Sequence, residues 1–314
     1  MKLRTLLTAF LIITCKAVSA QQWIDITDIY LTNPSFNGNS TTGWTWQSNA
    51  GSQKADRETF EFWNGTFDIW QTIQVPAGKY RLKVQAFYRS GDHDTSYAEY
   101  QSNSEQLKAF IYANQTEQPV ASIYTSYTNY NYGDSWRSPD RRDYPNGMQS
   151  GSAMFAEGSY ENQIEFNMPA TGELRLGIKC PENDRYGNWI MMDNFRLEYY
   201  GTNVKVSSIK LSSASLTIGV GDKSQLKATI SPSNALNQKL TWSSSNTSVV
   251  QVDEKGMLTA VAKGSATITA TANDGSGVKA TCAVTVTKNE ATAGSLIINE
   301  LQAANIDMFV DPSF

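Results

Sequence analysis

The sequence of 314 residues has very little cysteine and histidine. It contains three cysteines and one histidine. Cys15 lies in the first 20 residues, which we interpret below as a cleaved leader. The other two, Cys180 and Cys282, fall in segments of different composition. A disulfide framework is therefore excluded, and we expect two unpaired, buried thiols. A catalytic Ser-His-Asp triad is disfavoured, because nothing in the sequence predicts that His93 reaches Ser135. We expect His93 to be solvated in a polar loop.

Long apolar runs and an excess of basic charge are also missing. After residue 20, no apolar stretch approaches the roughly 18 to 20 residues that cross a bilayer. The chain has 26 Lys and Arg against 30 Asp and Glu, a formal net charge of −4. Because the summed field repels polyanions, no nucleic-acid partner and no anionic membrane are expected.

The first 20 residues have the pattern of a cleaved signal peptide. Lys2 and Arg4 precede the apolar run 6–13, and the small residues 18–20 offer a cleavage site. An alternative is a lipoprotein acylated at Cys15. Either interpretation predicts a protein that is exported across the inner membrane and is secreted or held at the cell surface.

Aromatic residues divide the remaining chain into segments. All 15 tyrosines and all but one of the eight tryptophans precede Gly201, whereas the stretch that follows is rich in Ser, Thr, Ala and Val. Short polar stretches mark the boundaries. We expect domains at 21–201 and 202–288, a linker at 289–294 and a further segment at 295–314.

Both domains show the period-two alternation of half-buried strands. Tyr80, Leu82 and Val84 share one face of a predicted strand, which Arg81 and Lys83 oppose. Similar strands are predicted at 164–168, 174–180 and 189–199. In the second domain, the alternation 280–286 predicts that Cys282 points into the core. Only two short helices are expected, near 104–110 and near 148–156. The fold class is therefore all-β, with two β-sandwiches.

Residues 206–287 resemble the group 2 bacterial immunoglobulin-like family. Pro232, Trp242, Ser243, Gly256 and Gly264 follow one another in the order of that family. The resemblance implies an immunoglobulin-like sandwich of the kind found in bacterial surface proteins and adhesins. Such modules frequently act as spacers and bring no catalytic residues.

Residues 23–201 resemble galactose-binding-like, carbohydrate-binding jelly rolls in secreted proteins of gut Bacteroidetes. The resemblance rests on the ordered motifs NPSF (33–36), FDIWQTI (67–73), PAGKY (76–80) and DNF (193–195). The last segment, through IINE (297–300), resembles the opening of a lamin-tail domain. That resemblance implies a truncated β-strand fragment at the C-terminus, which in such proteins can precede a spore-coat-H-like kinase domain.

The segment 124–144 combines aromatic rings with polar groups, as glycan recognition requires. Flat rings stack on the C–H faces of a sugar, while amides, acids and Arg bind its hydroxyls. The segment also reads as a long loop, and long loops in compact domains are commonly functional. The candidate ligand-binding residues are Tyr127, Tyr130, Tyr132, Trp136 and Arg137. The alternative is that these rings simply cap the sandwich.

Asp193 presents a carboxylate on an otherwise apolar strand face. Alternation places it with Trp189, Met191, Phe195 and Leu197, where an unpaired charge costs several kcal/mol. The jelly-roll resemblance implies a structural calcium held by this aspartate, by the residue just after the N-terminal Phe, here Asn37, and by backbone carbonyls. An Arg partner, backbone N–H groups or an edge position are the alternatives.

These features predict a secreted or surface-displayed, non-catalytic binding protein. Its first domain would hold a glycan or a cell-surface polymer, and its second would act as a spacer. One alternative is that these are accessory modules of a larger secreted enzyme, kinase-like or glycan-degrading. Another is a protein-binding adhesin.

Overall fold

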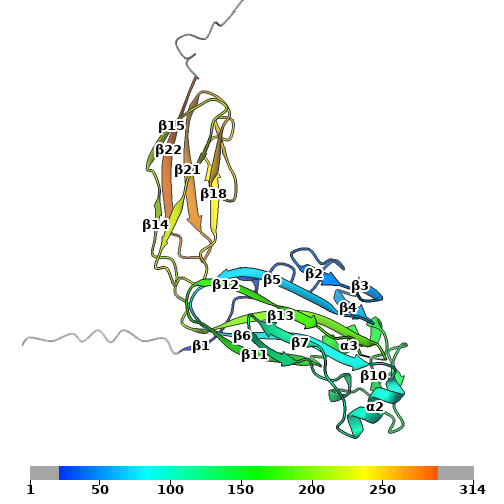
Figure 1. Cartoon of the computed structure of the whole chain (residues 1–314). Coiled ribbons are helices and arrows are strands. Elements are labelled where there is room, and N and C mark those ends of the chain that lie inside the picture. Colours follow the sequence, from blue (N-terminus) through cyan, green and yellow to red (C-terminus); the bar gives the residue numbers. More distant parts are fainter. Residues whose placement is uncertain (1–20, 185, 289–314) are drawn as a thin grey trace, which may run out of the picture. The chain divides into compact units, whose positions relative to one another are not determined.

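A computed structural model describes residues 21–184 and 186–288 (Figure 1). The expected signal peptide and the segment 295–314 lie outside the described residues. Contacts divide the chain into two units, of which the first ends at Lys205 and also includes Pro232–Asn237. The second comprises Val206–Ser231 and the chain from Gln238 onward. Within the described part, no helix has the length and apolarity that a membrane span requires.

The first unit is built from two antiparallel sheets. One has the order β11-β6-β13-β4-β3, with β1 beside β13, and the other has the order β2-β5-β12-β7-β8. The strands of the first sheet are β11 (Glu161–Met168), β6 (Gly78–Ser90), β13 (Asn188–Gly201), β4 (Thr59–Trp63), β3 (Ser52–Asp56) and β1 (Gln22–Asp25). Those of the second are β2 (Thr45–Ser48), β5 (Phe67–Val75), β12 (Gly172–Cys180), β7 (Phe110–Ala113) and β8 (Thr116–Pro119).

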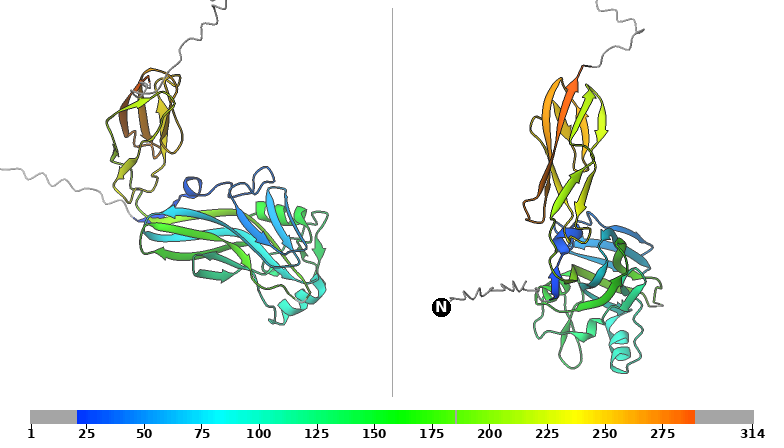
Figure 2. Two further views of the ribbon diagram at one scale, coloured as in Figure 1. Left: turned by 45° about the horizontal axis from the view of Figure 1, so that its top comes forward. Right: turned by 90° about the vertical axis from the view of Figure 1, so that its left-hand side faces the viewer.

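The short elements of this unit gather at one end. They are the hairpin β9 (Trp136–Arg137) and β10 (Asp143–Tyr144), with α2 (His93–Gln101), η1 (Ile123–Thr125) and α3 (Met148–Ala156). This end lies away from β1 (Figures 1 and 2). The helix α1 (Thr27–Tyr30) instead follows β1.

The predicted alternation is confirmed in the core of the first unit. Tyr80, Leu82 and Val84 are fully buried between the sheets, and Arg81 and Lys83 face outward. The helix α3 has the predicted bounds. The helix predicted near 104–110 is wrong, because that stretch is irregular until β7 begins at Phe110. The structure forms α2 instead, where Asp92 accepts a hydrogen bond from Thr95 N at 2.9 Å and so caps the helix.

The second unit is an immunoglobulin-like sandwich, as predicted. Its main sheet has the order β15 (Ser215–Gly219), β22 (Lys279–Thr287), β21 (Gly264–Ala272) and β18 (Leu240–Ser244). The other strands form the sheet β16 (Lys223–Gln225), β20 (Met257–Ala260) and β19 (Val250–Val252), and the pair β14 (Ser208–Leu211) and β17 (Ala228–Ser231). Cys282 is fully buried in the core, as its position in the alternation predicts. Cys180 is buried in the first unit, and both thiols are free.

A β-bulge changes the predicted faces of β13. Pairing with β6 shifts register between Asp193 and Arg196, and Asn194 has a positive φ of 52°. Trp189 and Met191 therefore pack on the outer face of the sheet, while Phe195 and Leu197 point into the core between the sheets. The expectation that all of these side chains share one face with Asp193 is wrong, since strict alternation stops at the bulge.

Candidate functional site

Strand register builds a row of side chains across the outer face of the first sheet. Ser52 pairs with Trp63, Trp63 with Trp189, and Trp189 with Arg89, so the row crosses β3, β4, β13 and β6. Neighbours such as Phe62 point the other way, into the core. The row therefore stands on a packed sheet, which holds its side chains in fixed positions.

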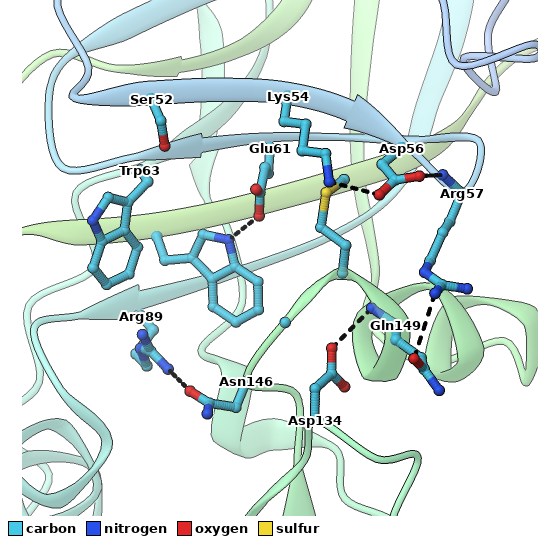
Figure 3. Close-up of a pocket in the computed structure, with 13 residues that line it drawn as sticks. Ser52, Lys54, Asp56, Arg57, Glu61, Trp63, Arg89, Asp134, Asn146 and Gln149 are labelled. Atoms are coloured by element: carbon cyan, nitrogen blue, oxygen red, sulfur yellow. Dashed lines mark hydrogen bonds and ion pairs between the residues drawn. The ribbon is translucent and has the colours of Figure 1, made fainter.

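This row is the floor of a cavity of about 520 Å³ (Figure 3). One wall is the β3–β4 hairpin, where Lys54 Nζ lies 2.7 Å from Asp56 Oδ2. The other wall is the start of α3. Asp134 accepts hydrogen bonds from Gln149 N at 3.1 Å and Ser150 N at 2.8 Å, and so caps that helix.

A second cavity of about 490 Å³ shares Trp63, Arg89 and Asn146 with the first. Its remaining lining residues come from the start of α2, from β9 and from the segment before β13, and they are Gly91, Asp92, His93, Asp94, Trp136 and Tyr186. Together the two cavities form a cleft at the helical end of the first unit. We call this the Arg89 cleft.

Arg89 lies between the two cavities with an unusual set of neighbours. It is only 5% exposed, and its Nη1 donates to Asn146 Oδ1 at 3.2 Å. Its guanidinium carbon lies 5.0 Å from the Trp189 ring centre and 5.5 Å from that of Trp63. Burial lowers the pKa of Arg89 to about 10, so the side chain is still cationic at neutral pH.

His93 is not solvated, contrary to the expectation from its polar neighbours. It is 5% exposed, and its ring stacks on Trp136 with centres 4.5 Å apart and planes 5° apart. Its Nδ1 lies 3.0 Å from the Tyr124 hydroxyl. Burial, and then the nearby charge of Arg89, lower the pKa of His93 to about 3, so the imidazole is neutral. His93 thus holds Trp136 at the cleft wall.

The predicted ligand-binding residues occupy different environments. Trp136 lines the Arg89 cleft, whereas the other four are not among the residues that line it. Tyr127 stacks under Arg142 at 4.5 Å, and Tyr130, which is 65% exposed, packs edge-on against Tyr132. The Tyr132 hydroxyl donates to Glu157, and Arg137 Nη1 lies 3.6 Å from Asp143 Oδ2.

Trp63, Trp189 and Arg89 were not predicted as site residues. A signal for Trp63 was present, because Phe60 and Phe62 take the core face of β4 and leave Glu61 and Trp63 on the outer face. The outer position of Trp63 follows from alternation, but its place beside Arg89 follows only from the register of three strands.

The predicted calcium ligands, Asp193 and Asn37, differ in burial. Burial raises the pKa of Asp193 to about 7, and its Oδ1 accepts from Asn194 N at 2.6 Å. The side chain of Asn37 is exposed. Among residues 21–184 and 186–288, no group of three or more His, Cys, Asp or Glu side chains could hold a metal ion. Calcium binding here would require backbone oxygens, and it stays a prediction.

Thermal unfolding measures whether calcium binds. If Asp193 is a ligand, calcium at about 100 times its Kd stabilises the fold by about 2.7 kcal/mol relative to chelator, and Asp193→Asn abolishes the shift. Asp253→Asn, in a turn of the second unit, serves as the control variant. An unfolding temperature that calcium leaves unchanged would contradict the prediction.

Comparison with known proteins places the second unit in a sequence family. Residues 205–292 match the family described as bacterial Ig-like domain (group 2). The chain is 41% identical over 93 residues to a lacto-N-biosidase of Bifidobacterium bifidum, which is 30% of this chain and 8% of that protein. It is 44% identical over 85 residues to an α-L-arabinofuranosidase of Bifidobacterium longum, covering 27% of this chain and 8% of that protein.

The chain matches only a small part of its curated relatives, between 8 and 29% of their length. Among solved structures, it is similar to the carbohydrate-binding module TmCBM61 in complex with β-1,4-galactotriose. That similarity has 18% identity and a TM-score of 0.29, and it covers 54% of this chain and 96% of the module.

Proposed function

We propose that the chain is a secreted or surface-displayed glycan-binding protein whose Arg89 cleft holds the sugar. The observation that carries this proposal is the cleft itself. Trp63 and Trp136 supply aromatic surface to a cavity that Arg89 and Asn146 line with polar groups. Ring faces for sugar C–H groups beside donors for hydroxyls are what carbohydrate recognition requires. The immunoglobulin-like unit would serve as a spacer.

The cleft is suited to binding rather than to chemistry. Its histidine is buried and neutral, with Nδ1 directed at the Tyr124 hydroxyl. Asp134 and Asp92 cap helices, and Glu61 accepts a hydrogen bond from Trp189 Nε1 at 2.7 Å. We therefore propose no catalytic role for these residues.

Glycan-array binding by the full chain tests the proposal. Trp63→Ala is expected to weaken binding about 5- to 30-fold, since loss of one stacked ring costs about 1 to 2 kcal/mol. Trp46→Ala is a matched control, because Trp46 has the same 38% exposure but does not line the cleft. Absence of binding to any glycan would overturn the proposal, as would equal losses in the two variants.

A second candidate is that the two units are accessory modules of a larger secreted enzyme. The observation that favours it is that the matched relatives include proteins named as lacto-N-biosidase and α-L-arabinofuranosidase. The genomic reading frame after Phe314 tests this candidate. A catalytic domain there supports it, and a stop codon or further immunoglobulin-like repeats contradict it.

A further inference from the structure

Four cations on the outer face of β6 differ in their partners. Three of them form ion pairs with carboxylates. These pairs are Lys79 Nζ to Glu165 Oε2 at 2.6 Å, Arg81 Nε to Glu198 Oε2 at 2.6 Å, and Lys83 Nζ to Glu161 Oε1 at 3.1 Å. Arg89, the most deeply buried of the four, has no carboxylate partner within the described chain. Its Nε is also buried without a hydrogen-bond partner there.

Three of the carboxylates that line the cleft with Arg89 are engaged in other hydrogen bonds. Glu61 accepts from the Trp189 indole at 2.7 Å. Asp92 accepts from Thr95 N at 2.9 Å and Asp134 from Ser150 N at 2.8 Å, each at the start of a helix. A carboxylate held by a helix N-terminus gains from the helix dipole and is not free to turn toward Arg89.

The charge of Asp92 acts on Arg89, but no carboxylate of the described chain pairs with it directly. A buried guanidinium without a direct ion pair is costly unless a ligand supplies one. Two indole rings lie within cation–π distance of Arg89, so the edge of the guanidinium, with its N–H groups, is the part left for a ligand. Edge-on, its N–H groups match the paired oxygens of a carboxylate or a sulfate. An oxyanion of a ligand would therefore complete the ion pair that Arg89 lacks.

We propose that the Arg89 cleft recognises an anionic sugar, whose carboxylate or sulfate ester is bound by the guanidinium of Arg89 while a sugar ring stacks on Trp63. This inference rests on the proposed glycan-binding function and narrows its ligand class. The first cavity, of about 520 Å³, falls within the range of sites that hold small ligands.

The charges of the lining residues favour the first cavity over the second as the binding site of the anion. Three cations, Lys54, Arg57 and Arg89, line the first cavity together with three carboxylates, so its lining has no net charge. The carboxylates are Asp56, Glu61 and Asp134, and Asp56 is paired with Lys54. Asp92 and Asp94 line the second, where Arg89 is the only cation among the lining residues that the structure describes. Because the chain as a whole is acidic, with a net charge of −4, long-range attraction does not help. Recognition depends on the short-range contact with Arg89, which salt screens weakly in a buried site.

The test uses the full chain and an array of uronate-containing and sulfated oligosaccharides. Each is printed beside its neutral counterpart, methyl-esterified or desulfated, and the best pair is followed by titration calorimetry. We expect the charged member to bind at least about tenfold more tightly than the neutral one. The uronate and sulfate arms decide which oxyanion is preferred.

Variants then assign the preference to Arg89. Arg89→Gln is expected to abolish the preference, so that the charged glycan and its neutral counterpart bind this variant with equal affinity. Arg89→Lys keeps the positive charge but lacks the paired N–H donors of the guanidinium. Its preference for the charged glycan should lie between those of the unaltered chain and Arg89→Gln. Lys83→Gln is the matched control, since it removes a cation from the same face of the same strand but outside the cleft.

The outcomes separate this inference from the function on which it rests. Trp63-dependent binding with equal affinity for charged and neutral glycans would overturn the inference and keep the proposed function. Failure to bind any glycan would overturn both. A charge preference that survives in a folded Arg89→Gln variant would place the anion elsewhere. If that variant does not fold, binding of charged and neutral glycans to the unaltered chain still decides whether the site prefers an anionic sugar.

Discussion

Replacing Gly177 with alanine is expected to destabilise the first sandwich by about 3 kcal/mol or more. Gly177 lies in the middle of β12, between Trp70 of β5 and Tyr112 of β7. A Cβ on this residue would lie 1.9 Å from Ile69 O, 2.9 Å from Ile69 C and 3.0 Å from Trp70 Cα. These are backbone atoms of a paired strand, so the overlap is relieved only by separating β12 from β5.

Gly172→Ala provides the matched control for this variant. Gly172 begins the same strand, and its nearest atom to an added Cβ is Ala170 O at 4.0 Å. Its free energy of unfolding should stay within about 0.5 kcal/mol of the unaltered chain. Denaturant unfolding of both variants measures the difference. Equal stabilities would show that the strands adjust around an added methyl group without cost.

The sandwich architecture could be predicted from the sequence because the alternation within each strand predicts which of its faces is buried. In β12 the buried Leu174, Leu176 and Ile178 alternate with Arg175, and the pattern needs no knowledge of neighbouring strands. The same local reasoning predicted α3 and the core position of Cys282. Burial and secondary structure that depend on one segment alone can therefore be predicted from the sequence.

The Arg89 cleft could not be predicted in this way, because it depends on how strands align. Trp63, Trp189 and Arg89 are far apart in the sequence, and only the pairing of β4, β13 and β6 brings them into one row. A shift of one residue in either pairing would turn a ring of the row toward the other face. The bulge at Asn194 is likewise invisible to alternation, since it adds a residue without changing the composition of the strand.

Trp136 was predicted as a ligand-binding residue from the composition of its loop, and the structure places it at the cleft. The structure also shows its support, which the sequence did not indicate. The polar residues around His93 suggested a solvated loop, but Asp92 caps α2 and turns His93 inward onto Trp136. The polar residues around His93 therefore cap and form a helix, and they do not form the solvated loop that the sequence suggested.

The buried neutral state of His93 predicts a loss of stability in acid. The pKa of His93 is lowered to about 3 in the folded chain, from about 6.5 when unfolded. Between these values the unfolded chain binds a proton that the folded chain does not. Folding stability therefore falls as the pH decreases from 6.5 toward 3, by up to about 1.4 kcal/mol for each pH unit. Because His93 stays neutral in the folded chain over this range, its contact with Trp136 is kept for as long as the chain remains folded.

Other buried groups act in the opposite direction and must be separated from His93. Burial raises the pKa values of Asp193 and Glu105 to about 7. These carboxyls bind protons more readily in the folded chain, so their contribution favours folding as the pH falls from 7 toward 4. The pH profile of the unaltered chain alone is a sum of both effects. The informative quantity is the difference from a variant in which only His93 no longer titrates.

His93→Phe is that variant. A phenyl ring keeps the stack on Trp136, and the Tyr124 hydroxyl keeps Ser96 Oγ at 2.6 Å as a partner. At pH 7.5 its unfolding free energy should differ little from that of the unaltered chain. At pH 4.5 the variant should be the more stable by about 2 to 3 kcal/mol, because about two pH units lie below the unfolded pKa. A difference that stays constant from pH 7.5 to 4.5 would show that His93 takes up a proton equally well in the folded chain.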